Sequence, residues 1–232
     1  MKTFNSHKKS ESTRWVRIYT NSKLFFLIIA LLFFSFVQSQ TWTSAQSGNW
    51  NNSSTWTGAS GTPPLNLQSG DEVKIESGHN ITLGNGTIVL KNNAKLSIIN
   101  GGQLNLDNGT FRLEQGSSST FEIINGSFSV SSNVEIFDGN INWQGAYVYV
   151  TNDLNIIRGS SHSIVNSCIL SSNDIKIEGN SNVTVDIDDS YLLVGVAPTS
   201  PTSPGSSGNI TFKGSGTTVN ITNTVLRSLG TT

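Results

Sequence analysis

Apolar and polar residues alternate along this chain in short runs that begin at Val73. Each run has the order apolar, polar, apolar and ends in a turn, often Asn-Gly or Asp-Gly. Because the side chains of a strand point alternately to its two faces, this spacing predicts short β-strands with one buried face. The first pairs are Val73/Ile75, Ile81/Leu83, Ile88/Leu90, Leu96/Ile98, Leu104/Leu106 and Phe111/Leu113, followed by Phe121/Ile123, Phe128/Val130, Val134/Ile136, Ile141/Trp143, Val148/Val150 and Leu154/Ile156.

Two all-β architectures fit this string of strands. Asn-Gly between alternating runs is a hairpin signal, which favours an antiparallel meander or sandwich. A parallel β-helix explains a second regularity, because every third pair recurs after 20–24 residues, a repeat length typical of solenoids. We therefore predict a single-stranded parallel β-helix and keep the antiparallel fold as the alternative. The repeat predicts these partners in neighbouring coils: Ile81 with Leu104, Ile88 with Phe111, Leu104 with Phe128, Phe111 with Val134, Phe121 with Ile141 and Val134 with Leu154.

The first 39 residues have the features of a signal peptide. A basic leader precedes the apolar run 24–37, which at 14 residues is shorter than the roughly 20 that span a bilayer. Small residues place the cleavage after Ser39. We expect a secreted or cell-surface protein with no stable membrane span after cleavage, and an uncut anchor is the alternative.

The remaining chain divides into four segments by composition. We expect the loop rich in Pro, Ser and Gly at residues 197–208 to project from the solenoid or to link it to the last strands. The final strands lack an evident cap, so we expect either a truncated solenoid or an end that pairs with a partner. The segments are an N-terminal cap at 40–72, the β-helix at 73–196, the loop at 197–208 and terminal strands at 209–232.

Charge and cysteine content narrow the possible partners. The leader holds six of the 14 Lys and Arg and one of the 15 acidic residues, which leaves residues 40–232 with a net charge of −6. An acidic chain without basic clusters is a poor binder of nucleic acid, so none is expected as a partner. Cys168 is the single cysteine and cannot form an internal disulfide, so we expect it to be a small buried hydrophobe.

Three tryptophans stand among small polar residues at the start of the mature chain. Large rings there either cover the open end of the first coil or stack on sugars from the surface. We predict that Trp50 and Trp56 form a structural cap, because soluble proteins seldom expose several large rings together. Trp42 is the less settled case and is our candidate for a sugar-binding ring.

The segment "GNWNNSSTWTGASGTPPLNLQSGDEVKIESGHNITL", residues 48–83, resembles the start of the eight-glycine domain. The matching elements are Trp50 and Trp56, the Pro63-Pro64 turn, Gly70-Asp71 and Gly78, each in its expected place relative to a strand. The resemblance implies an extracellular module with a right-handed, pectin-lyase-like β-helix, of a kind that often begins exported proteins of the Bacteroidota. It also implies recognition of extracellular ligands or glycans, and it supplies no set of catalytic residues.

The candidate chemistry is sparse. Asp186, Asp188 and Asp189 are the densest carboxylates, and Asp186 and Asp188 would share one strand face. They are weak candidates for catalytic acids or for a Ca²⁺ site, and a solvated outer face explains their spacing equally well. Arg158 and His162 could assist sugar-acid elimination, although a plain surface loop is the simpler interpretation. No cofactor is expected beyond this possible Ca²⁺.

These observations favour a non-catalytic, exported β-solenoid that presents a polar Asn/Ser/Thr surface to glycans or other cell-surface material. One alternative is a fragment of a β-helical polysaccharide lyase or glycoside hydrolase that uses the three aspartates with Arg158. The lack of Lys/Arg clusters weighs against uronate substrates. A further alternative is a structural spacer for another domain.

Overall fold

The structure, a computed structural model, describes residues 39–229, except 69, 115, 117, 160, 180–182, 198–199 and 205–206. Between residues 197 and 206 it describes the backbone alone. The predicted leader, apart from its last residue, lies outside the described part. Within the described part there is no helix long and apolar enough to cross a membrane.

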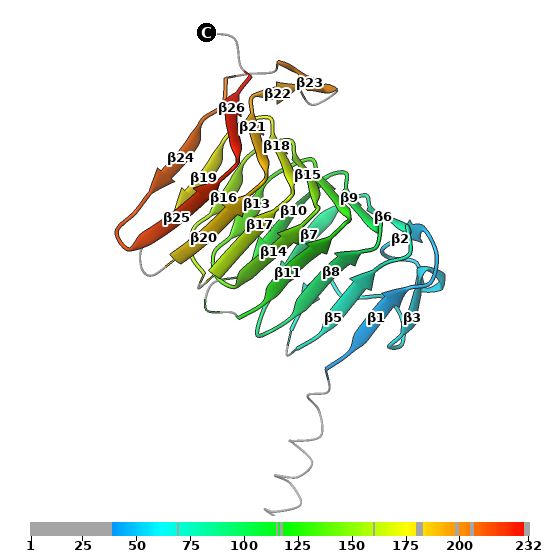
Figure 1. The fold of residues 1–232 in the computed structure, drawn as a ribbon. Coiled ribbons are helices and arrows are strands. Elements are labelled where there is room, and N and C mark those ends of the chain that lie inside the picture. The colour runs from blue at the N-terminus through cyan, green and yellow to red at the C-terminus, as the bar shows by residue number, and fades with distance from the viewer. Residues whose placement is uncertain are drawn as a thin grey trace, which may run out of the picture. The chain divides into compact units, whose positions relative to one another are not determined.

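The described chain winds into a β-solenoid with three faces, so the predicted parallel β-helix is confirmed and the antiparallel meander is wrong (Figure 1). Apart from β3 (Trp56–Gly58), each strand of these faces pairs in parallel with its equivalent in the neighbouring coil, and the three faces are called sheets A, B and C. Sheet A contains β1 (Thr41–Ser44), β3 (Trp56–Gly58), β5 (Glu72–Ile75), β8 (Lys95–Ile99), β11 (Thr120–Ile124), β14 (Asn140–Gln144), β17 (Ser161–Val165), β20 (Val183–Asp188) and β25 (Thr217–Thr222).

The other two faces are built in the same way. Sheet B contains β2 (Gly48–Asn49), β6 (Asn80–Leu83), β9 (Gln103–Leu106), β12 (Ser127–Val130), β15 (Tyr147–Val150), β18 (Cys168–Ser171), β21 (Tyr191–Val194) and β26 (Val225–Ser228). Sheet C contains β4 (Asn66–Leu67), β7 (Gly86–Leu90), β10 (Gly109–Leu113), β13 (Val134–Ile136), β16 (Leu154–Ile156), β19 (Ile175–Glu178) and β24 (Ile210–Lys213).

The register between coils agrees with the sequence repeat at every predicted position. The six confirmed partners are Ile81–Leu104, Ile88–Phe111, Leu104–Phe128, Phe111–Val134, Phe121–Ile141 and Val134–Leu154. A position inside one coil therefore stacks on the equivalent position of the next. The inward apolar side chains of the strands form columns in a continuous buried core. Phe111, Phe121, Phe128 and Trp143 meet there, with ring centroids 4.3–5.8 Å apart.

The corner between sheets A and B repeats one backbone conformation from coil to coil. A residue at positive φ occupies this corner, and asparagine or aspartate tolerates that conformation better than most side chains. A second column, Ser167, Ser190 and Thr224, places a hydroxyl oxygen where it accepts a backbone N–H from the preceding coil. The non-glycine residues with φ of 44–60° at this corner are Ser77, Asn100, Asn125, Asn166, Asp189 and Asn223.

The tryptophans lie at the N-terminal end of the core. Strand β3 pairs antiparallel with β1 and ends sheet A, and the chain then crosses from sheet A to sheet C before β4. The indole N–H of Trp50 donates to the Pro63 carbonyl on this crossing (2.9 Å), and that of Trp56 donates to the Trp50 carbonyl (2.8 Å). The two rings meet edge to face at 5.2 Å, and Trp50 is fully buried. They fill the end of the coil beneath the crossing segment.

The last coil is longer than the others because it contains an insertion. Between β21 and β24 the chain forms an antiparallel hairpin of β22 (Val196–Ala197) and β23 (Ser200–Pro204), within the Pro/Ser/Gly-rich stretch (Figure 1). Strands β24, β25 and β26 then rejoin sheets C, A and B. Their inward side chains, including Phe212, Ile221 and Leu226, are partly exposed because no described coil follows them.

We predict that Trp50→Ala lowers the free energy of unfolding by about 3–5 kcal/mol, because it removes a fully buried ring and its hydrogen bond to Pro63. Chemical denaturation measures this change. The control is Tyr191→Ala, which truncates an exposed ring and should change stability by less than about 0.5 kcal/mol. Equal effects of the two substitutions would contradict a capping role for Trp50.

Candidate functional site

The three outer faces of the solenoid differ in charge. In the described strands of sheet B, Arg227 in the last strand is the one charged residue. Charged residues in sheet A strands are Glu72, Lys74, Lys95, Glu122, Asp186 and Asp188, and those in sheet C strands are Arg112, Glu135, Lys176, Glu178 and Lys213. Sheet B from β6 to β21 is therefore a neutral face on an acidic chain, and we call it the neutral face.

Several charges on the other two faces form ion pairs across neighbouring coils. Lys95 Nζ lies 2.8 Å from Glu122 Oε2 on sheet A, and the Arg112 guanidinium contacts Glu135 on sheet C. Burial alone would raise the pKa of Glu122, but hydrogen bonding and attraction from Lys95 outweigh it, and the pKa is lowered. Lys176 lies 3.5 Å from Asp153 of the preceding coil and 3.0 Å from Asp174 of its own coil. Sheets A and C therefore differ from sheet B in carrying charges, several of which are paired.

The first half of the neutral face carries amides and hydroxyls. Asn105 Nδ2 donates to Asn80 Oδ1 (2.7 Å), and Ser129 Oγ donates to Asn105 Oδ1 (2.6 Å), so one polar chain crosses three coils. Such side chains offer both donors and acceptors without a charge that must be desolvated. The outward residues of this half are Asn80, Thr82, Gln103, Asn105, Ser127 and Ser129.

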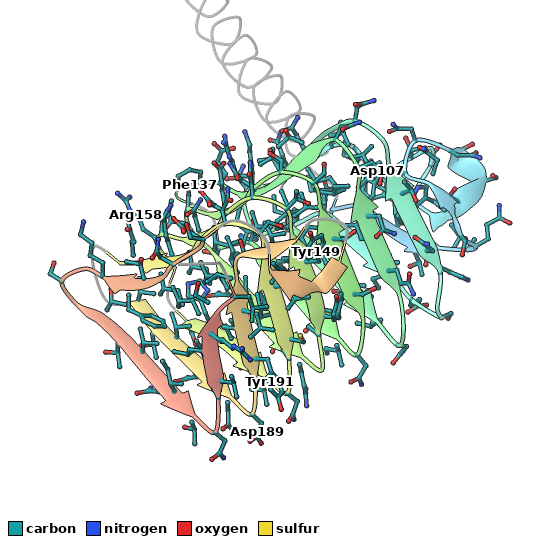
Figure 2. All side chains as sticks on the ribbon, turned by 90° about the horizontal axis from the view of Figure 1, so that it is seen from above. Asp107, Phe137, Tyr149, Arg158, Asp189 and Tyr191 are labelled. Carbon is teal, nitrogen blue, oxygen red and sulfur yellow. The ribbon has the colours of Figure 1, made fainter. Side chains whose placement is uncertain are left out.

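The second half of the neutral face is aromatic and apolar. Tyr147 and Tyr191 are 42% and 54% exposed and occupy one outward column, with Cys168 between them. Tyr149 and Leu193 lie in the adjacent outward column, and Tyr149 and Tyr191 are labelled in Figure 2. The expectation that Cys168 is a small buried hydrophobe is wrong, because its side chain is half-buried on the outer side of β18.

Thiols and phenols are ordinarily protonated near neutral pH, so Cys168 and Tyr147 add no negative charge to this surface. Burial raises the pKa of the Cys168 thiol further. Burial also raises the pKa of the Tyr147 hydroxyl, with smaller contributions from Cys168 and Tyr149.

The sequences of three sheet B strands already indicate this surface, because apolar residues do not alternate with polar ones there. The runs "YVYV", "CIL" and "YLLV" place an aromatic or apolar residue at outward as well as inward positions. A strand with a wet outer face should alternate, so loss of alternation in three successive sheet B strands marks an exposed apolar strip. Which of these residues share an outer face depends on the strand register, which the runs by themselves do not give.

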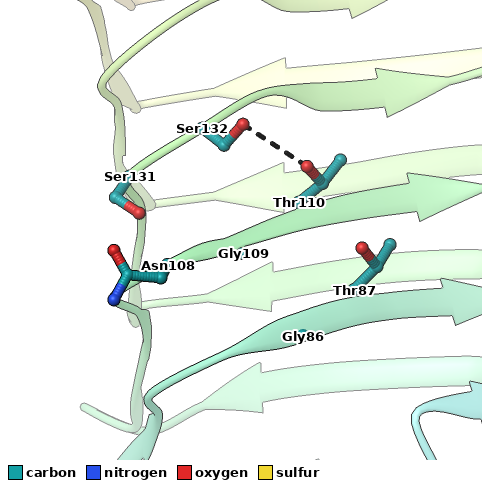
Figure 3. Close-up of a pocket in the computed structure, with 7 residues that line it drawn as sticks. All are labelled: Gly86, Thr87, Asn108, Gly109, Thr110, Ser131 and Ser132. Carbon is teal, nitrogen blue, oxygen red and sulfur yellow. Dashed lines mark hydrogen bonds between the residues drawn. The ribbon is translucent and has the colours of Figure 1, made fainter.

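A polar groove lies at the corner between sheets B and C. It has a volume of about 310 Å³ and is hollowed where Gly86 and Gly109 stack without side chains (Figure 3). A Cβ at Gly109 would lie 2.2 Å from the Gly86 carbonyl oxygen, so only glycine fits there. The groove lies beyond the ends of β6 and β9, next to the exposed Asp107 that follows β9. Its lining is Gly86, Thr87, Asn108, Gly109, Thr110, Ser131 and Ser132.

The structure does not bring the predicted catalytic candidates together. Asp186 and Asp188 share the outer side of β20, and Asp186 accepts a 2.7 Å hydrogen bond from Asn220. Asp189 is at the corner between sheets A and B with φ of 44°. Arg158 follows β16 and precedes β17, so it lies at the opposite end of sheet A from Asp189 (Figure 2). These four groups do not converge on a common point.

His162 is a core residue rather than a surface base. Its ring is fully buried in β17, in the column that also contains Ile141 and Val185. Nε2 lies 3.1 Å from the Arg158 carbonyl oxygen, and Nδ1 accepts from the Ile141 N–H at 3.4 Å. This arrangement suits a neutral imidazole with its proton on Nε2. Burial lowers the pKa of His162 to about 4, partly offset by the bond to Arg158.

Trp42 is also internal. It is 2% exposed, and its strand β1 pairs with β5 so that Trp42 lies beside Val73. A ring buried to this degree has no free face for stacking on a sugar. On the neutral face Tyr147 and Tyr191 are exposed, whereas Trp42, Trp50 and Trp56 are buried.

Comparison with known proteins does not assign this chain to a family. No family model, no curated protein and no solved structure matches this chain. The β-helical part of the resemblance noted for residues 48–83 agrees with the observed fold. Membership of the eight-glycine family stays a prediction.

Calcium binding by Asp186 and Asp188 also stays a prediction. Among the described residues no group of three or more His, Cys, Asp or Glu side chains is placed to hold a metal ion. If the pair binds Ca²⁺, the melting temperature should rise with added Ca²⁺ and return with EDTA, and Asp186→Asn should abolish that rise. An identical melting temperature in Ca²⁺ and EDTA would exclude the site.

We predict that the stability of the folded protein falls as the pH decreases from about 6.5 to 4. The folded state holds His162 neutral, with a pKa of about 4, whereas the unfolded chain binds a proton near 6.5. The stabilisation is therefore complete above 6.5, and about 3 kcal/mol is lost by pH 4. Denaturation of the wild type and of His162→Asn measures the difference. Parallel curves over this interval would contradict the assignment.

Proposed function

We propose that this protein is an exported, non-catalytic β-solenoid module that binds neutral extracellular glycans on the outer face of sheet B. The observation that carries the proposal is the neutral face itself. It runs from β6 to β21 without a charged residue, while the other two faces are charged. Export is supported by the signal-peptide features of residues 1–39 and by the resemblance of residues 48–83 to an extracellular module.

The chemistry of the neutral face suits a sugar chain. Sugars present hydroxyl edges, which hydrogen-bond to amides and hydroxyls, and apolar C–H faces, which pack on aromatic rings. The polar half supplies Asn80, Asn105 and Ser129, and the aromatic half supplies Tyr147 and Tyr191. A long sheet face gives many weak contacts to an extended ligand and does not need a deep pocket.

The enzyme alternative receives no support from the arrangement of its residues. Asp186 and Asp188 lie on sheet A, Asp189 lies at a corner, and Arg158 lies at the far end of that sheet. His162, the other candidate, is buried with both ring nitrogens engaged. A general acid or base must reach the bond that it acts on, and this set does not define such a place.

The direct test is titration of the purified protein with neutral hexasaccharides and with hexagalacturonate. We expect measurable binding of a neutral chain and weaker binding of the charged chain, because the face offers no cation to pair with a carboxylate. Isothermal calorimetry measures both. Binding of the uronate alone would contradict the proposal, as would the absence of binding to every glycan.

Matched charge insertions locate the binding surface. Ser127→Glu places a carboxylate on the neutral face, and Thr184→Glu places the same group outward on sheet A. We expect Ser127→Glu to weaken glycan binding at least about tenfold, because the new charge must be desolvated under the ligand. Thr184→Glu should leave affinity within about twofold. Equal effects of the two variants would place the ligand elsewhere.

A further inference from the structure

Two exposed tyrosines of the neutral face lie two coils apart. Tyr147 in β15 pairs with Cys168 in β18, and Cys168 pairs with Tyr191 in β21, all in one outward column. Neighbouring strands are about 4.8 Å apart, so the two tyrosine backbones are separated by about 9.6 Å along the solenoid axis. The half-buried Cys168 leaves a low position between two exposed rings.

The same column continues into the polar half. Register places Ser127 one coil before Tyr147, Gln103 one coil before Ser127, and Asn80 one coil before Gln103. A ligand that follows this column therefore meets hydrogen-bonding side chains first and two rings afterwards. Each position of the column stacks on its equivalent in the next coil without a register shift.

An extended β-1,4-linked glycan has a matching period. Successive sugars in such a chain are turned by about half a rotation, so every second sugar presents the same face to one side. Its two-sugar repeat is nearly the length of two strand spacings in a solenoid. Chains with α-1,4 or β-1,3 links curve and lose this alignment after a few sugars.

We propose that the neutral face is specific for an extended, neutral β-1,4-linked glycan that lies along the solenoid axis. Every second sugar stacks on Tyr147 or Tyr191, and the sugar between them lies over Cys168. The remaining sugars follow Ser127 and Gln103 and hydrogen-bond there. The inference rests on the proposed function. It adds the linkage of the glycan, its orientation along the solenoid axis and the residues that contact it.

The first test compares hexasaccharides of equal length and different linkage. Cellohexaose and β-1,4-mannohexaose should bind at least about tenfold more tightly than maltohexaose or the β-1,3-linked laminarihexaose. Tyr147→Ala and Tyr191→Ala should each weaken β-1,4 binding about tenfold, whereas Tyr147→Phe and Tyr191→Phe should retain it within about threefold. Both tyrosines are exposed, so their truncation should leave the melting temperature unchanged.

The second test moves one ring along the column. In a Tyr147→Ala background, Gln103→Tyr places the rings four coils apart, and Ser127→Tyr places them three coils apart. Only a separation of an even number of coils matches a two-sugar repeat. Compared with Tyr147→Ala alone, the added Gln103→Tyr should therefore raise the affinity for cellohexaose at least about threefold. The added Ser127→Tyr should not raise it.

The outcomes separate this inference from the proposed function. If no neutral glycan binds, the proposed function fails together with the inference. If glycans bind but all linkages bind alike, or if the tyrosine variants keep full affinity, or if both spacings restore binding equally, the linkage inference alone is overturned. Selective β-1,4 binding with recovery at the even spacing supports it.

Discussion

Main-chain hydrogen bonding between successive coils is the constraint on which this protein depends. Parallel pairing places each residue directly over its equivalent one coil earlier, so both inward and outward positions become columns. The inward columns must be apolar because they form the dry core. The outward columns are not constrained in this way, and they can carry a surface chemistry that repeats at the strand spacing. The function proposed for sheet B is a consequence of that repetition.

Much of this fold could be predicted from the sequence, because parallel pairing between coils requires apolar residues to recur at a regular interval. Alternation identified the strands, and the recurrence of every third pair identified coil partners such as Ile81 with Leu104. The antiparallel hairpin β22–β23 within the last coil could not be predicted in the same way. It falls in a Pro/Ser/Gly-rich insertion, where neither alternation nor the coil repeat applies.

The candidate site was harder to predict because it depends on which strands share a face. Asp186, Asp188 and Asp189 are close in sequence, yet one of them turns the corner to the next sheet. Tyr147 and Tyr191 are far apart in sequence, yet they lie two coils apart in one column. His162 shows the opposite error, since a polar residue in a core position is recognised only when its burial and both of its hydrogen bonds are known.

The measurement that tests the central claim most directly is a crystal structure of the protein with bound cellohexaose. The account predicts one continuous chain along the solenoid axis on the outer side of sheet B, with sugar rings stacked on Tyr147 and Tyr191 and their spacing matched to two coils. A chain that crosses the strands at another angle, or that lies on sheet A or sheet C, would contradict it.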